Sequence, residues 1–88
     1  MNRTNLKELL RRPYSRLIVS DEETGRFTAE MVEFSGCFAE GDTIEEAARN
    51  LEEAAESWML AVIERGQEIP EPTGDNEYSG KFVVRVPR

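Results

Sequence analysis

The stretch from Asp42 to Gly66 constrains the fold of this chain most, because it carries a helix start signal, a helix stop signal and helical periodicity between them. Thr43 and Glu46 form a capping box, in which the Thr43 hydroxyl accepts the Glu46 N–H and the Glu46 carboxylate accepts the Thr43 N–H. Gly66 supplies the left-handed residue at which many helices end. These signals predict one long helix.

At about 100° per residue, the apolar side chains of this helix fall on one stripe and charged side chains fall opposite it. The stripe consists of Ile44, Ala47, Ala48, Leu51, Ala54, Ala55, Trp58 and Val62, and the opposite face of Glu45, Arg49, Glu53 and Glu56. Met59 and Ile63 flank the stripe and Leu60 projects from the polar face, so this half is apolar nearly all round. It therefore needs a second cover, either the N-terminal segment of the chain or another subunit.

Length and composition predict one domain over residues 1–88, because 39% hydrophobic content suffices for one two-layer core. No run approaches the roughly 18 apolar residues that span a bilayer, and the N-terminus lacks the apolar core of a signal peptide. We therefore expect a cytoplasmic protein with no membrane contact. Cys37 is the single cysteine and there is no histidine, so we expect no internal disulfide, no metal site and no histidine-based acid or base.

The net charge of −7 is unevenly distributed. Residues 20–79 carry seventeen acidic and three basic side chains, a net charge of −14, whereas residues 1–19 and 80–88 carry +4 and +3. The acidic part would repel nucleic acid and attract a basic protein partner. The plainer interpretation, that acidic side chains keep a small domain soluble, stays open.

Residues 1–12 predict a short N-terminal helix with Leu6, Leu9 and Leu10 on one face. A helix of this length is marginal alone, so it should persist only if its leucines dock, and the surplus apolar surface around Leu60 and Ile63 is the candidate dock. A basic cluster also lies here, formed by Lys7, Arg11, Arg12 and Arg16. It is an alternative nucleic-acid patch, although Tyr14 is its one aromatic residue for stacking.

Three short stretches separated by turns predict an antiparallel meander ahead of the long helix. They span residues 14–20, 27–34 and 37–40, and the first, with three consecutive apolar residues, is typical of a strand buried on both faces or nearly so. Together with the helix they form a β-β-β-α core over residues 14–72. A polar loop at 73–80 and a last strand at 81–86 follow. We therefore predict an α+β domain in which one long helix covers a four-stranded sheet.

Candidate catalytic groups are few. Glu30, Glu33, Glu40 and Asp42 lie on or next to the predicted strands, and clustered carboxylates of this kind hold the metal ions of two-metal nucleases. Glu30 and Glu40 could face each other across the second and third strands, but their alternation with apolar residues is typical of solvent-facing carboxylates. Cys37 has no histidine to activate it. We expect no catalytic residues and no cofactor, hence a protein that is not an enzyme.

Two motifs carry a family resemblance. The first is Gly36-Cys37-Phe38-Ala39-Glu40-Gly41-Asp42-Thr43-Ile44-Glu45-Glu46-Ala47, and the second is Gly66-Gln67-Glu68-Ile69-Pro70-Glu71-Pro72. With the preceding strands they resemble the HicB family, antitoxins of HicA ribonuclease toxins, over roughly residues 14–86. The resemblance implies a partial RNase H-like β-β-β-α-β fold with the last strand beside the first, and a catalytically inert domain that binds HicA and blocks its access to RNA.

Members of that family often continue into a ribbon-helix-helix or helix-turn-helix module that binds operator DNA, whereas this sequence ends at Arg88. If the chain is complete, we therefore expect no direct DNA binding through such a module, and we expect any dimer to use the remaining domain.

We predict a HicB-like antitoxin that neutralises a small basic HicA-type toxin and forms a homo-oligomer. The predicted protein interface comprises Met59, Leu60 and Ile63 from the surplus apolar half of the helix, and Phe82, Val84 and Arg85 from the last strand. A strand at a chain end commonly lies at a sheet edge, where its unpaired backbone groups invite a partner. Two alternatives remain open: a metal-dependent nuclease on an RNase H-like fold, and a homo-oligomeric domain without a toxin.

Overall fold

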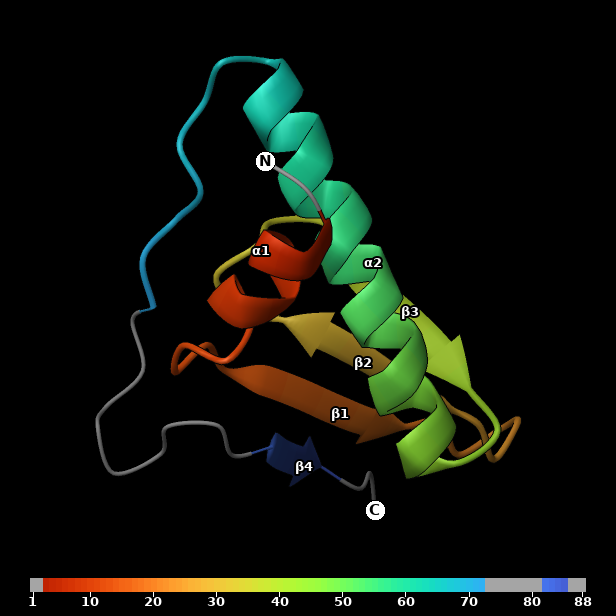
Figure 1. The fold of residues 1–88 in the computed structure, drawn as a ribbon. Helices are drawn as coiled ribbons and strands as arrows, with labels where there is room; N and C mark the ends of the chain where they lie inside the picture. The colour runs from red at the N-terminus through yellow and green to blue at the C-terminus, as the bar shows by residue number, and fades with distance from the viewer. Residues whose placement is uncertain (1–2, 73–81, 86–88) are drawn as a thin grey trace.

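The computed structural model describes residues 3–72 and 82–85, so the predicted loop at 73–80 lies outside the described residues. The elements in chain order are α1 (Arg3–Leu9), β1 (Arg16–Ser20), β2 (Phe27–Met31), β3 (Phe38–Gly41), α2 (Ile44–Glu64) and β4 (Phe82–Arg85) (Figure 1). The α+β class, the long helix and the short N-terminal helix are confirmed. β1 and β2 are shorter than predicted, and β3 begins and ends one residue later than predicted.

The sheet is built outward from β1. β1 pairs antiparallel with β2, with Ile18 opposite Ala29, and β2 pairs antiparallel with β3, with Ala29 opposite Ala39. The predicted three-stranded antiparallel meander is therefore confirmed. On its other side β1 pairs in parallel with β4, with Ile18 in register with Val84, and the strand order is β3-β2-β1-β4.

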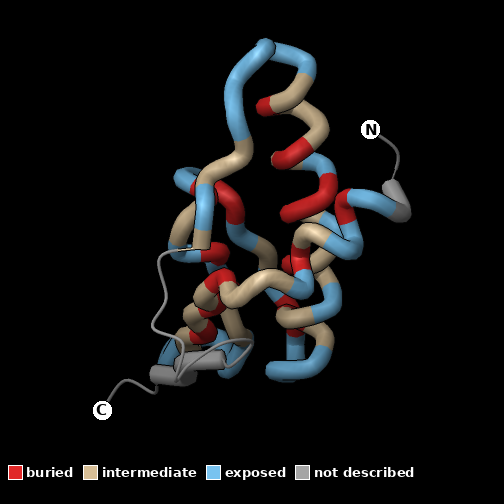
Figure 2. The backbone as a smooth tube through the Cα atoms, turned by 60° about the vertical axis from the view of Figure 1, so that its left-hand side comes forward, coloured by how far each residue is buried: buried red, intermediate tan, exposed pale blue. Residues whose placement is uncertain are grey.

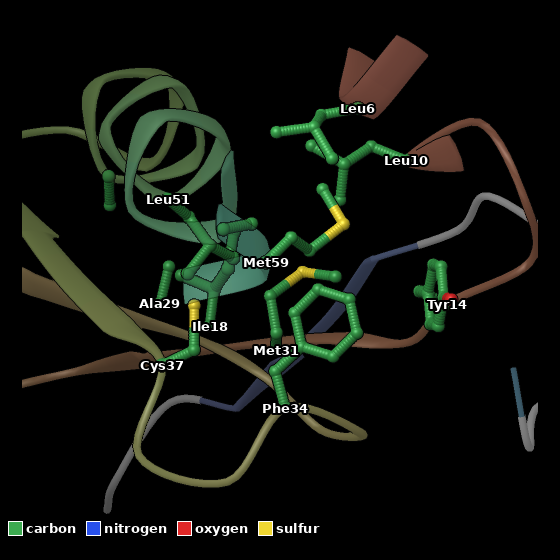
Figure 3. Close-up of a cluster of buried hydrophobic side chains, with 12 residues drawn as sticks. Leu6, Leu10, Tyr14, Ile18, Ala29, Met31, Phe34, Cys37, Leu51 and Met59 are labelled. Carbon is green, nitrogen blue, oxygen red and sulfur yellow. The ribbon is translucent and has the colours of Figure 1, made fainter. Parts of the chain in front are cut away.

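Both helices lie on the same side of the sheet (Figure 1). Strand side chains alternate between the two sides, so Ala29 and Met31 of β2 are buried toward the helices while Glu30 is exposed. One core cluster fills the space between the layers (Figure 3). Its members come from both helices, two strands and the adjoining turns: Leu6, Leu10, Tyr14, Ile18, Ala29, Met31, Phe34, Cys37, Ala47, Leu51, Ala55 and Met59.

The ends of α2 follow the sequence signals with one change. The Thr43 Oγ1 accepts the Glu46 N–H at 3.0 Å, as predicted, but the Glu46 carboxylate accepts the N–H of Asp42 at 2.9 Å, one residue before the predicted donor. Gly66 has a φ of 73°, and the N–H groups of Gly66 and Gln67 bond to the carbonyls of Ile63 and Val62. This pair of bonds is a Schellman motif, which satisfies the last carbonyls of the helix. The chain from 64 to 68 is exposed at this end (Figure 2).

The buried stripe of α2 differs most clearly from the predicted stripe at three positions. Ala47, Leu51, Ala55 and Val62 are buried as predicted, but Ile44 is 40% exposed and Trp58 is half-buried. Glu56, predicted on the polar face, is 5% exposed. The prediction that Glu56 lies on the polar face was wrong because α1 and the segment before β1 pack against a second side of α2. The predicted stripe includes only the side that faces the sheet.

Gly41 permits the closest approach between a strand and α2. A Cβ placed on Gly41 would lie 2.4 Å from the Ala47 backbone nitrogen, well inside van der Waals contact. The atom it would meet is backbone, so no side-chain rotation can relieve the overlap. The start of α2 can therefore lie directly against the end of β3 because residue 41 has no side chain.

We expect Gly41→Ala to lower the free energy of unfolding by about 1–3 kcal/mol, the usual cost of overpacking a tight contact. Urea denaturation followed by circular dichroism measures this change. Ser57→Ala, at an exposed α2 position, is the control and should change stability by less than about 0.5 kcal/mol. Equal stability of Gly41→Ala and the wild type would show that β3 and α2 are not in the described contact.

Candidate protein-binding surfaces

The surplus apolar half of α2 is covered mainly by the chain itself. The Met59 side chain is fully buried, in the same cluster as Leu6 and Leu10 of α1 and the turn after it (Figure 3). Leu60 and Ile63 are partly buried and pack against this cluster. Of the two covers considered for this half of the helix, the N-terminal segment is the one observed. In this conformation Met59 is not accessible to a partner, whereas Leu60 and Ile63 retain exposed surface.

The predicted interface residues of the last strand lie in another part of the molecule. Phe82 and Val84 stand in register with Arg16 and Ile18, and Arg85 stands in register with Val19. β4 and the C-terminal half of α2 lie at opposite ends of the fold (Figure 1). The structure therefore does not gather the six predicted interface residues into one surface, and their contact with a partner stays a prediction.

The proposed basic patch is divided between different environments. Arg16 is 6% exposed and its Nη2 donates to the Glu52 carboxylate at 2.8 Å and to the Leu10 carbonyl at 3.1 Å. Arg12 pairs with Glu71, and its guanidinium lies 5.7 Å from the centre of the Tyr14 ring. Two of the four basic side chains thus make contacts within the chain, and the nucleic-acid interpretation of this cluster loses its support.

An aromatic group ties the segment after α2 to the core. Tyr14 and Phe34 lie with ring centres 4.8 Å apart, and Phe34 stacks on Trp58 at 4.4 Å with an interplanar angle of 4°. The Trp58 Nε1–H donates to the Ser35 carbonyl at 2.9 Å, and the Tyr14 hydroxyl donates to the Pro70 carbonyl at 2.6 Å. The pKa of the Tyr14 hydroxyl is raised, mainly because the side chain is buried. The hydroxyl therefore stays protonated and holds the Pro70 segment in place.

The candidate carboxylates do not converge. Glu30 pairs with Phe38 and Glu40 with Thr28, so the prediction that Glu30 and Glu40 could stand directly opposite each other was wrong. Arg26 pairs with Asp42 at 2.9 Å and lies 3.8 Å from Glu40. Among the described residues, no group of three or more histidine, cysteine, aspartate or glutamate side chains is placed to hold a metal ion.

Cys37 is a buried residue of the core cluster. It is 3% exposed, and burial raises the pKa of its thiol from 9.0 to about 11. Because thiolate is the reactive form, this environment makes the native cysteine slow toward thiol reagents.

We expect native Cys37 to react with Ellman's reagent at pH 8 far more slowly than the unfolded chain does. The same shift links stability to pH, since the unfolded thiol ionises near pH 9 while the native thiol stays protonated to about 11. The stabilisation is complete below pH 9 and is lost as the pH rises to about 11. Urea titrations at several pH values should show that the free energy of unfolding falls less with rising pH in Cys37→Ala than in the wild type. Rapid labelling of the native protein by Ellman's reagent would contradict the burial of Cys37.

The far side of the sheet, which sequence reasoning missed, carries exposed apolar side chains. We call Leu17, Val19, Thr28, Glu30, Phe38 and Glu40 the outer sheet face, since pairing places them together on the side opposite the helices. Phe38 is 60% exposed, and Val32, just after β2, is 54% exposed. The signal that could have found this face is the consecutive apolar run in β1, because one of its two sides must point away from the helices.

A hollow adjoins the outer sheet face at the β1–β2 turn. Its walls are Val19, Ser20 and Thr28 from the strands and Asp21, Glu22 and Glu23 from the turn. The Asp21 Oδ1 accepts the backbone N–H groups of Glu23 and Thr24 at 2.8 and 3.4 Å, which orders the turn. Since three of its six lining residues carry carboxylates, the hollow suits a basic side chain better than an anion.

These features define a small acidic α+β domain with surfaces suited to protein contacts. The chain matches the family described as HicB_like antitoxin of bacterial toxin-antitoxin system over residues 14–83, and it belongs to this family. Among solved structures it is similar to TTHA0281 from Thermus thermophilus, with 30% identity and a TM-score of 0.53, covering 80% of this chain and 85% of that chain. No curated protein matches the chain. None of the helices in the described part combines the length and hydropathy that crossing a membrane requires.

Proposed function

We propose that this chain is a non-enzymatic antitoxin that binds a small basic HicA-type ribonuclease toxin and neutralises it. The observation that carries the proposal is the family match over residues 14–83, which includes both sheet and long helix. The family implies a toxin partner, and the HicA type is our inference from the sequence resemblance. The RNA that such a toxin cleaves lies in the cytoplasm, and we propose the same location for this protein.

Charge supplies a physical basis for neutralisation. A ribonuclease that holds RNA needs basic side chains against the phosphates. Residues 20–79 of this chain carry a net charge of −14 and so attract a surface of that kind. Binding would cover the basic surface and repel RNA from it. This mechanism needs no catalytic group on the antitoxin.

We also propose that residues 1–88 form one domain of partial RNase H-like type. Support comes from the element order β-β-β-α-β and the strand order β3-β2-β1-β4, in which the last strand is parallel to the first. The described carboxylates do not form a metal-binding group, so the nuclease alternative gains no support from the arrangement of the described residues.

Self-association is a further part of the proposal. Leu60 and Ile63 keep partly exposed apolar surface on α2, and β4 lies at one end of the strand order. Leu60→Asp should weaken a homo-oligomer by placing a carboxylate in the apolar contact, as measured by sedimentation velocity. Glu64→Ala, one turn further along α2 and exposed, is the control. Unchanged assembly of Leu60→Asp would show that Leu60 is simply a partly exposed leucine.

The proposed function is tested by co-purifying this chain with the small protein encoded next to it, and by measuring RNA cleavage with and without the chain. We expect a complex whose affinity falls with added salt, and loss of RNA cleavage when the chain is added. An unrelated acidic protein of similar size and charge controls for non-specific attraction and should not protect the RNA.

Two results would contradict the proposal. If nothing binds and the chain alone is a stable oligomer without nuclease activity, the domain is homo-oligomeric without a toxin. If the chain alone cleaves RNA in the presence of Mg²⁺, the nuclease alternative is correct.

A further inference from the structure

The outer sheet face combines the apolar side chains of Leu17, Val19 and Phe38 with polar ones, and neither described helix covers it. Pairing places Leu17, Glu30 and Phe38 in one row across three strands, with Val19, Thr28 and Glu40 in the next row. Both helices lie on the opposite side of the sheet (Figure 1). Phe38, at 60% exposure, is among the most exposed large hydrophobic side chains described. An exposed aromatic residue on a sheet face that no helix covers is typical of a protein-binding surface.

The charges on this face select the kind of partner. Glu30 stands between Leu17 and Phe38 in its row, and no cation pairs with it among the described residues. Glu22 and Glu23 rim the adjoining hollow. A partner that buried Phe38 would also bring these carboxylates into a drier environment, where they need opposite charges. Lysine and arginine side chains supply such charges.

A second copy of this chain fits the face less well. Packing one outer sheet face on another would bring two sets of the same carboxylates into one interface, and like charges placed together are costly. Strand addition at the β3 edge is also restricted, because Asn50 of α2 donates its side-chain N–H to the Glu40 carbonyl at 2.8 Å. The favoured geometry is therefore a partner lying across the face rather than a strand added to the edge.

We propose that the outer sheet face, with Phe38 as its apolar anchor, is the surface on which the basic protein partner docks. The inference rests on the proposed function and specifies its surface: Phe38 inserts among apolar groups of the partner, and Glu30 with the Glu22–Glu23 rim pairs with basic side chains. This surface is distinct from the α2 residues predicted from the sequence, whereas Arg85 of β4 stands in register with Val19 at its edge.

The experiment uses the whole 88-residue chain and the small protein encoded next to it, with affinities measured by isothermal titration calorimetry. Phe38→Ser should weaken binding by a factor of about 30 or more, as loss of a central aromatic anchor does. Glu30→Lys should also weaken binding, because its new positive charge repels the basic partner. The loss of affinity should be larger at low salt, where the repulsion is less screened.

Glu53→Lys is the matched control, since it makes the same charge change at an exposed position of α2, on the other side of the sheet. Its affinity should stay within about twofold of the wild type, because a distant surface charge has little effect on a docked contact. Because Phe38 is mostly exposed, its replacement should leave the urea midpoint unchanged, which separates binding from folding.

The outcomes separate this inference from the function on which it rests. If the wild type forms no complex with the basic protein, both are overturned. If the wild type binds and Phe38→Ser binds equally well, the docking surface alone is overturned. If Phe38→Ser instead dissociates an oligomer of the chain alone, the face is a contact between copies and the inference is likewise wrong.

Discussion

The close packing of α2 against the sheet is the contact on which the rest of this structure depends. At its N-terminal end α2 touches β3 at Gly41, where a Cβ would overlap the Ala47 backbone. Ala47, Leu51 and Ala55 continue the buried stripe over the sheet. Small side chains here allow the helix to approach the sheet closely, and Ile18 and Met31 are at most 1% exposed between them.

The second half of α2 solves a different packing problem. Its apolar surface is wider than a four-stranded sheet of short strands can cover, so the N-terminal segment docks on it through Leu6 and Leu10. Arg16 makes the polar contacts at this junction. Its guanidinium donates hydrogen bonds to the carboxylate of Glu52 in α2 and to the carbonyl of Leu10. A buried guanidinium with several acceptors is stable where a lone one would not be. The short N-terminal helix thus persists because it is fixed by both apolar and ionic contacts.

Both described helices cover the same side of the sheet. Phe38, Leu17 and Val19 lie on the other side, with carboxylates between and around them. A catalytic site would need several polar groups directed at one point, whereas these side chains are spread over a surface. The chain belongs to the HicB_like antitoxin family, and an exposed surface of this kind is suited to contact with another protein.

The sequence by itself determined the local structure. The Thr43 cap, the Gly66 stop and the alternation in β2 could be predicted because capping, left-handed φ values and strand periodicity depend on near neighbours in the chain. Tertiary structure alone decided the burial of Glu56 and Arg16, the register that places Phe38 rather than Glu40 opposite Glu30, and the exposure of Phe38. Each of these depends on which distant segment lies opposite, and a pattern read along one segment does not contain that information.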